Sequence, residues 1–241
     1  MKLEGQVALI TGGSHGLGLA IGHALRAEGA AISVMARPSA ELDHAVSSLD
    51  GGGEHAMAAP ADVTQAAEVE KGVKATIERW GRLDILVLNA GTWAGAPIAE
   101  TTEQQWDMLL DLNLKGAFLA LKYATPWLTA QKRGTVIGIS SLGGTVGQPG
   151  SAAYAASKWG LRGLLESAAL ELKPDRVRVS IVFPHNINSA GKAIAPGSED
   201  RDKNLEPADI ASLVAWICTA PGHVSVGNVT IWPLAAGIRM K

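Results

Sequence analysis

The chain has 241 residues, 47% of them apolar and 18% charged, which suits a soluble globular protein with one large core. Its net charge of −2, without a lysine or arginine block, argues against binding to nucleic acid or to an anionic membrane surface. The single cysteine, Cys218, excludes an intrachain disulfide and indicates a reducing compartment. No apolar run reaches the ~18 residues of a membrane-spanning helix. Because the N-terminus enters a strand at once, we expect no signal peptide and a cytoplasmic location.

Apolar strand patterns alternate with helical periodicity along the whole chain. The expected strands are 7–10, 31–35, 56–59, 85–88, 136–139, 177–183 and 229–232, and the expected helices are 16–28, 40–49, 65–80, 103–130, 152–172 and 207–219. Strands that are apolar on both faces are typical of a buried parallel sheet. We therefore predict an α/β fold, a single domain over residues 1–241 with a doubly wound, Rossmann-like parallel sheet of about seven strands and helices on both faces. Trp80, Trp216 and Trp232 are expected in the core.

A glycine-rich turn, from Thr11 to Gly18, follows the first expected strand and leads into a helix. Glycines allow a tight turn and close backbone approach, and a helix N-terminus offers free N–H groups to a pyrophosphate. The spacing is GxxxGxG and not GxGxxG, and a glycine turn without a ligand is the alternative. Because the turn comes directly after the first strand, we predict a nucleotide site formed by Gly12, Ser14, His15, Gly16, Leu17 and Gly18.

The end of the second strand carries Arg37 and offers no carboxylate until Glu41 in the next helix. An acidic residue at this position would bond a ribose 2′-hydroxyl, whereas an arginine accommodates a 2′-phosphate. Arg37 can clamp such a phosphate, with Ser39 and His15 assisting. A surface arginine in a loop is the alternative interpretation. The pattern favours NADP(H), and NAD(H) is the second choice.

Polar and small residues close the next two strands. Asp62-Val63 follows the third strand, where the carboxylate can either accept from an adenine amino group or cap the helix near residue 65. Asn89-Ala90-Gly91 follows the fourth strand and is small enough for a ring to lie against the backbone. Asn113 lies within a predicted helix, where asparagine is a mediocre helix former, and a polar role is plausible for it.

The segment from residue 134 to 174 combines a strand that ends at Ser141, a glycine-rich loop and a helix for which Ser151 is a suitable N-cap. Tyr154 and Lys158 lie four residues apart on one face of this helix, directed toward its N-terminus. A nearby cation favours the phenolate, so such a tyrosine can exchange a proton with an alcohol or alkoxide. A partly buried tyrosine and a solvated lysine without a catalytic role are the alternative.

Taken together, these motifs resemble the short-chain dehydrogenase/reductase family. The resemblance rests on the glycines of the Thr11–Gly18 turn, Asn89-Ala90-Gly91, Asn113, Ser141 and the pair Tyr154 and Lys158. They occur in the order and spacing of that family, including the thirteen residues from Ser141 to Tyr154, and the likeness covers nearly the whole chain.

The resemblance implies a catalytic role for four residues. Tyr154 would be the general acid/base, and Lys158 would bond the nicotinamide ribose and lower the pKa of the tyrosine. Ser141 would hold the substrate oxygen, and Asn113 would support a water in a proton relay. The cofactor would be bound by the glycine turn, Arg37, Asp62, Val63, Asn89, Ala90, Gly91, Tyr154, Lys158, Pro184 and Ile187.

Three features depart from the family pattern. Leu88 stands where an asparagine is frequent, and His185 replaces the glycine that follows Pro184, so we expect it to shift the cofactor or line the pocket. The substrate loop near residues 186–206 is short, with roughly two dozen residues between Pro184 and the helix at 207. This predicts an open or shallow substrate site, or one completed by a neighbouring subunit.

The expected function is NADP(H)-dependent interconversion of a carbonyl compound, a ketone or aldehyde, and the corresponding alcohol. The alternatives are an NAD-linked alcohol dehydrogenase and a non-catalytic nucleotide-sensing or scaffold protein. The resemblance also implies a homo-oligomer, a tetramer or dimer that packs helices 103–130 and 152–172. The six histidines lack ligand spacing, so no metal site is expected.

Overall fold

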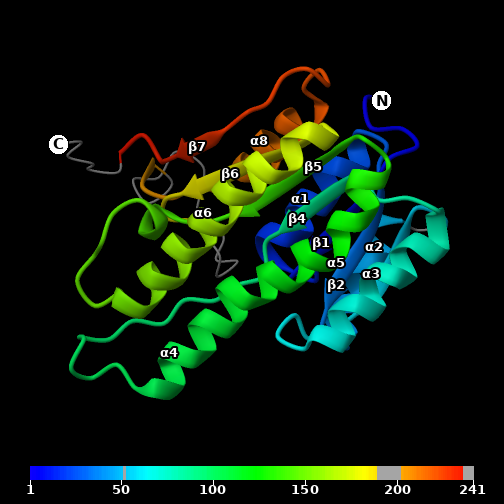
Figure 1. The fold of residues 1–241 in the computed structure, drawn as a ribbon. Helices are drawn as coiled ribbons and strands as arrows, with labels where there is room; N and C mark the ends of the chain where they lie inside the picture. The colour runs from blue at the N-terminus through cyan, green and yellow to red at the C-terminus, as the bar shows by residue number, and fades with distance from the viewer. Residues whose placement is uncertain (51–52, 189–201, 236–241) are drawn as a thin grey trace.

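The computed structural model describes residues 1–50, 53–188 and 202–235. In this part of the chain seven parallel strands form one sheet in the order β3-β2-β1-β4-β5-β6-β7 (Figure 1). The strands are β1 (Val7–Thr11), β2 (Ala31–Ala36), β3 (Ala56–Pro60), β4 (Ile85–Leu88), β5 (Gly134–Ile139), β6 (Val177–Pro184) and β7 (Asn228–Ile231). The strand order reverses between β1 and β4, and such a switch point opens a crevice at the carboxyl ends of the strands.

Helices cover both faces of the sheet (Figure 1). They are α1 (Gly16–Ala27), α2 (Ala40–Leu49), α3 (Ala66–Trp80), α4 (Glu103–Leu110), α5 (Gly116–Ala130), α6 (Ala152–Leu172) and α8 (Pro207–Thr219). One apolar cluster joins α1, α2 and α8 to one face, and a second joins α3, α5 and α6 to the other. Leu9 packs into the second cluster, whereas its neighbours Ala8 and Ile10 pack into the first. This explains why the strands are apolar at successive positions.

The fold class and the elements agree with the expectations from the sequence. All seven strands and all expected helices are present, and no end is displaced by more than two residues. Ser151 precedes α6 as expected, but its side chain makes no capping hydrogen bond. Cys218 is buried as expected of a small apolar side chain.

One expectation about the helices is confirmed only in part, and another is wrong. The helix expected over 103–130 is interrupted by a π-helical turn, Asp111–Lys115, which contains Asn113. Trp216 on α8 is 60% exposed and does not belong to the core, whereas Trp80 and Trp232 are partly buried. No helix that the structure describes combines the length and the apolar character needed to cross a membrane.

Candidate active site

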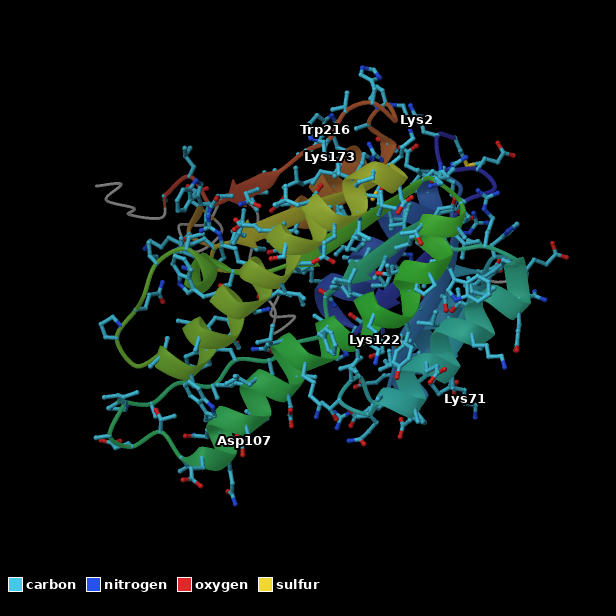
Figure 2. All side chains as sticks on the ribbon, in the orientation of Figure 1. Lys2, Lys71, Asp107, Lys122, Lys173 and Trp216 are labelled. Carbon is cyan, nitrogen blue, oxygen red and sulfur yellow. The ribbon has the colours of Figure 1, made fainter. Side chains whose placement is uncertain are left out.

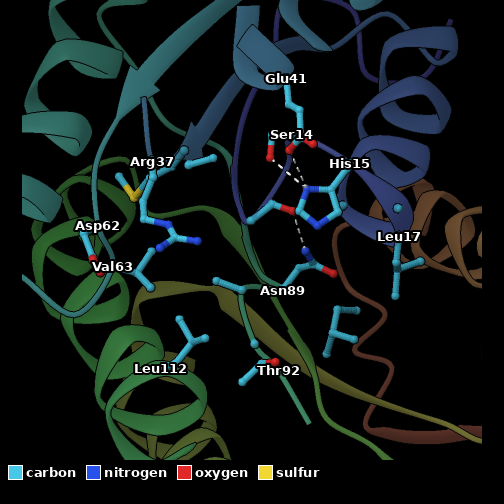
Figure 3. A pocket seen from close by; sticks show the side chains of 18 of the residues that line it. Ser14, His15, Leu17, Arg37, Glu41, Asp62, Val63, Asn89, Thr92 and Leu112 are labelled. Carbon is cyan, nitrogen blue, oxygen red and sulfur yellow. Dashed lines mark hydrogen bonds and ion pairs between the residues drawn. The ribbon is translucent and has the colours of Figure 1, made fainter. Parts of the chain in front are cut away.

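A cleft of about 860 Å³ lies over the carboxyl ends of the strands, within the size range of small-molecule sites (Figure 3). With the exception of Pro184, every residue predicted to bind the cofactor lines it. These are Gly12, Ser14, His15, Gly16, Leu17, Gly18, Arg37, Asp62, Val63, Asn89, Ala90, Gly91, Tyr154, Lys158 and Ile187. The fold thus brings together residues that are up to 175 positions apart, from Gly12 to Ile187.

The glycine turn is held closed by contacts that leave no room for side chains. A Cβ on Gly18 would lie 2.2 Å from the Gly12 carbonyl oxygen, and a Cβ on Gly12 would lie 2.8 Å from the Ala90 Cα. Asn89 fastens the turn, because its Nδ2 donates to the carbonyls of Thr11 and Gly12, both at 3.0 Å. Gly16 differs from these glycines, since a Cβ there would meet nothing within 4 Å.

The open space at Gly16 fits an anionic group at the start of α1. The N-cap residue, His15, makes no side-chain capping hydrogen bond, so the first N–H groups of the helix have no side-chain acceptor from their cap. Unpaired N–H groups and the helix dipole together favour a phosphate at such a position. The residues of this turn therefore fit the pyrophosphate of a dinucleotide.

Exposed charged side chains line the cleft beyond the end of β2. Arg37 extends into the cleft, and His15 lies across from it beside Glu41 (Figure 3). The His15 Nδ1 is 3.0 Å from the Ser14 hydroxyl and 3.8 Å from a Glu41 carboxylate oxygen. The Ser39 hydroxyl, which we expected to assist Arg37, accepts the Leu42 backbone N–H as the cap of α2. This end of the cleft thus offers two basic side chains, Arg37 and His15, and two carboxylates, Glu41 and Asp62.

Asp62 closes a tight turn after β3. Its Oδ1 accepts hydrogen bonds from the Thr64 backbone N–H at 2.9 Å and the Thr64 hydroxyl at 2.8 Å. The Thr64 backbone N–H is the main cause that lowers the pKa of Asp62, and Arg37 contributes in the same direction. The N-cap of α3 is Gln65, so the alternative role of Asp62 as a helix cap is wrong. Val63 lies within this turn and packs closely against Gly116 at the start of α5.

Asn113 is fully buried in the π-helical turn, and its amide links three segments. Its Oδ1 accepts the Thr92 N–H at 2.7 Å, while its Nδ2 donates to the Thr92 carbonyl and to the Ser157 hydroxyl, both at 3.0 Å. The Ser157 hydroxyl in turn donates to the Tyr154 carbonyl at 2.7 Å. Asn113 therefore fixes the loop after β4 relative to the turn of α6 that carries Tyr154.

Tyr154 and Lys158 line the inner end of the cleft, and Ser141 lies next to Tyr154 without belonging to the lining. A Cβ on Gly143 would lie 3.1 Å from the Tyr154 ring and 3.8 Å from the Ser141 hydroxyl oxygen, which places both groups around this glycine. Lys158 is buried, and its Nζ donates to the Ile139 carbonyl at 3.1 Å. The same Nζ lies 5.9 Å from the centroid of the Tyr154 ring.

Burial controls the protonation of this inner group. It raises the pKa of the Tyr154 phenol, and a hydrogen bond with Ser141 lowers it by less. Burial also lowers the pKa of the Lys158 amine from 10.5 to about 8. The expected lowering of the Tyr154 pKa is therefore not found in this geometry, because loss of hydration outweighs the other contributions.

Pro184 and His185 are not brought into the cleft. Pro184 is buried at the end of β6, where it pairs with Ile231 of β7. The His185 backbone N–H donates to the Ile231 carbonyl at 3.0 Å, and its ring lies 6.2 Å from the Trp232 ring. His185 therefore does not line the pocket as we expected. Residues 189–201 of the predicted substrate loop lie outside the described residues.

Several cleft residues were missed by the sequence analysis. Trp93, two residues after Gly91, lies at the cleft and is 65% exposed. Others lie at or shortly after the carboxyl end of a strand, a signal that would have identified them, and they include Met35, Ala36, Ala61, Ile139 and Thr92. Within residues 1–50, 53–188 and 202–235, no group of His, Cys, Asp and Glu could hold a metal ion.

Comparison with known proteins agrees with the fold and with the motifs. A family model described as short chain dehydrogenase matches residues 6–196. An uncharacterized oxidoreductase of Listeria innocua is 31% identical, over 97% of this chain and 98% of that protein. A solved metagenomic short-chain oxidoreductase in complex with NADP has a TM-score of 0.84 and 36% identity, with coverage of 97% and 99%. An alcohol dehydrogenase from Thermococcus sibiricus complexed with 5-hydroxy-NADP has a TM-score of 0.87 and 28% identity, with coverage of 95% and 97%. The chain therefore belongs to the short-chain dehydrogenase family of oxidoreductases.

Proposed function

We propose that this protein is an NADP(H)-dependent oxidoreductase that interconverts a ketone or aldehyde and the corresponding alcohol. The observation that carries the proposal is the position of Tyr154 and Lys158 at one end of a cleft whose other end carries Arg37, with Ser141 next to Tyr154. A proton donor beside a hydroxyl that can hold a carbonyl oxygen is what carbonyl reduction requires of the protein.

The side chains at the inner end divide the work of proton transfer. Ser141 donates a hydrogen bond to the substrate oxygen, and Tyr154 gives that oxygen its phenolic proton during reduction or takes it back during oxidation. Lys158, with a pKa of about 8, is mostly protonated at neutral pH and stabilises the phenolate that remains. NADPH supplies the hydride when bound.

Asn113 acts in this proposal through position. Its bond to the Ser157 hydroxyl, which bonds the Tyr154 carbonyl, supports the turn that aims the phenol into the cleft. Its two bonds to Thr92 fix the opposite wall of the cleft. A role for Asn113 in supporting a water of the proton relay is compatible with this arrangement and remains part of the proposal.

Arg37 and His15 support the preference for NADP(H), because both can bond a 2′-phosphate in the exposed part of the cleft. The metagenomic relative in complex with NADP agrees with this preference. Glu41 favours the second candidate, an NAD(H)-linked enzyme, because its carboxylate lines the same part of the cleft and can accept from a ribose 2′-hydroxyl.

A homo-oligomer is the proposed assembly. Large apolar side chains are exposed on the helices that the resemblance assigns to the interface, and they are Trp106, Met108, Phe118, Trp127, Trp159 and Leu170. A monomer rarely leaves so many large apolar groups in water. Light scattering of the purified protein tests the assembly, and a monomer at all concentrations would contradict it.

The test of the function is a substrate screen with purified protein. Consumption of NADPH and NADH is followed spectrophotometrically with a panel of aliphatic and aromatic ketones and aldehydes. In the reverse direction, formation of NADPH from NADP+ and of NADH from NAD+ is followed with the matching alcohols. We expect turnover with NADPH and at least one carbonyl compound. Binding of NADPH without turnover of any compound would favour a nucleotide-sensing protein, and turnover with NADH alone would favour the NAD-linked alternative.

A further inference from the structure

A second cavity, of about 410 Å³, lies at the opposite edge of the sheet, where the strands begin. Its walls come from the N-terminal segment, the residues that lead into β5 and β6, and the turn after α8. Figure 1 shows the N-terminus and the connection from α8 to β7 at the same end of the molecule. Nothing in the proposed reaction uses this cavity, which is separated from the cleft by the length of the sheet.

Basic side chains dominate the lining of this cavity, and they are Lys2, Lys132, Arg133, Arg176 and Arg178. Asp84 is the one carboxylate among the described residues that line it. This carboxylate already accepts two hydrogen bonds from Arg82, at 2.7 and 2.8 Å, and one from the Val7 N–H at 2.9 Å. Lys132 is paired with Asp175 at 2.6 Å. The other basic side chains, which are Lys2, Arg133, Arg176 and Arg178, make no ion pair shorter than 3.8 Å in the described part of the chain.

Arg178 is a partly buried cation held only by neutral groups. Its guanidinium donates to the Thr135 hydroxyl at 2.8 Å and to backbone carbonyls, of which those of Val224 and Ala220 are nearest at 3.0 and 3.1 Å. In the described part of the chain no carboxylate lies within ion-pair distance of it. The neighbouring Cys218 thiol brings no charge at neutral pH, since burial raises its pKa to about 12. A partly buried charge without a counter-ion is costly, and an anion would reduce that cost.

Arg133 and Arg176 lie next to each other, each directly before the start of one of two adjacent strands, β5 and β6. Gly134 of β5 pairs with Val177 of β6, so the residues just before them occupy neighbouring positions. The Arg133 Nε is 3.8 Å from an Asp84 carboxylate oxygen. The same oxygen already pairs with Arg82 at 2.7 Å, so Asp84 compensates little of the Arg133 charge. Two exposed like charges side by side repel each other unless an anion lies between them.

We propose that this cavity binds a small molecule with two or more phosphate or carboxylate groups, held by Arg133 and Arg176 next to Arg178. The planar forks of arginine suit both kinds of oxyanion, and a cleft lined by one sign of charge concentrates ions of the opposite sign. The Thr135 and Arg178 side chains, which face each other across β5 and β6, form the inner wall of the site.

The test is isothermal titration of the full chain with sodium pyrophosphate and, separately, with sodium citrate. The decisive variant is Arg133→Gln with Arg176→Asn, because asparagine tolerates the left-handed backbone of Arg176, whose φ is +59°. A matched control, Lys71→Gln with Lys122→Gln, removes the same charge from α3 and α5, away from the cavity (Figure 2). The variants Arg37→Ala and Gly16→Asp report any binding of pyrophosphate to the cleft, at the expected 2′-phosphate position and at the glycine turn, and aspartate tolerates the left-handed backbone of Gly16.

We expect one site per chain whose affinity falls at least tenfold in the double arginine variant and less than twofold in the lysine control and in Arg37→Ala. Tighter binding of pyrophosphate would assign the site to phosphates, and tighter binding of citrate to carboxylates. Absence of binding, equal losses in the arginine and lysine variants, or a loss confined to Arg37→Ala or to Gly16→Asp would overturn the proposal. Arg133→Gln alone, at an exposed side chain, serves if the double variant does not fold. No turnover is needed, so the result is independent of the proposed reaction.

Discussion

The inner end of the cleft is enclosed by protein, whereas the end near Arg37 is open to water. Asn113 and Lys158 are 0% and 5% exposed, while the side chains of His15 and Glu41 are about three-quarters exposed. At the inner end burial shifts the pKa of Tyr154 upward and that of Lys158 downward. At the outer end the groups keep their hydration and act by charge.

This difference separates the effects of substitution at the two ends. A buried ionisable group is destabilised by loss of water, so its replacement changes activity and the free energy of unfolding together. An exposed charge contributes through an interaction that salt screens, so its replacement changes ligand affinity and little else. Predictions at the two ends therefore differ in kind as well as in size.

The largest expected effect is that of Tyr154→Phe at the inner end. The ring still packs beside Gly143, but the proton is gone, and kcat for carbonyl reduction should fall by about 10³-fold. Because the substitution removes a group needed mainly in the transition state, we expect NADPH affinity to change by no more than about twofold. The measurements are steady-state kinetics and fluorescence titration. Tyr123→Phe, which alters the other tyrosine, is the control, and retained turnover in Tyr154→Phe would contradict the assignment.

Lys158→Met should reduce kcat and at the same time stabilise the fold. The Lys158 pKa falls from 10.5 to about 8 in the folded state, so the unfolded chain binds the proton more tightly. Stability of the parent protein therefore rises with pH between about 8 and 10.5, and the full cost of the buried charge is present below pH 8. This lowering of the Lys158 pKa corresponds to a loss of about 3 kcal/mol in the free energy of unfolding below pH 8. Loss of the bond to the Ile139 carbonyl offsets ~1 kcal/mol of it, so the expected net gain at pH 7 is about 2 kcal/mol.

Urea denaturation at pH 7 and pH 10 checks this expectation. The difference between Lys158→Met and the parent protein should shrink at the higher pH, where the parent amine is neutral in the folded state. Lys71→Met, at an exposed position of α3, is the control and should leave stability nearly unchanged at both pH values. A variant less stable than the parent at pH 7 would show that the amine is not desolvated as the structure indicates.

The sequence pattern was sufficient to predict those features that depend on the order of neighbouring residues. The strands are apolar at successive positions because both faces are covered, and that pattern is visible in residues such as Ala8, Leu9 and Ile10. The glycine turn was recognisable because Gly12 and Gly18 leave no room for a Cβ, a requirement that the residue type itself reveals. The arrangement of Ser141, Tyr154 and Lys158 followed from helix periodicity and from the strand end.

What the sequence did not reveal depends on contacts between distant segments. The π-helical turn at Asn113 coincides with bonds to Thr92 and Ser157, which are 21 and 44 residues away. The pKa of Tyr154 depends on how much water the folded chain excludes, which the spacing of Tyr154 and Lys158 does not encode. Trp216 was misplaced because an apolar side chain on a helix gives the same pattern whether it faces the core or water.

At the open end the larger effect is expected for Arg37→Ala. A charge-assisted hydrogen bond to phosphate contributes ~1.5–3 kcal/mol, so NADPH should bind about 10–100-fold more weakly. NADH lacks the 2′-phosphate, and its affinity should change by less than about twofold. Titrations of both cofactors by fluorescence measure the two constants, with Arg79→Ala on α3 as the control for loss of surface charge. Equal weakening of NADPH and NADH would contradict the phosphate clamp.

The smallest effect is expected for Glu41→Gln, and its sign decides what the carboxylate does. Glu41 lies 3.8 Å from His15 in the part of the cleft where we place the 2′-phosphate, and two negative groups there repel. NADPH should therefore bind about two- to fivefold more tightly to the variant, and the gain should decline at 0.5 M NaCl because both side chains are exposed. Glu70→Gln on α3 removes the same charge away from the cleft. If the variant instead binds NADPH more weakly, Glu41 holds His15 in place for the phosphate. If only the affinity for NADH falls, the carboxylate bonds the ribose, and the outer end of the cleft accommodates the two cofactors through different residues.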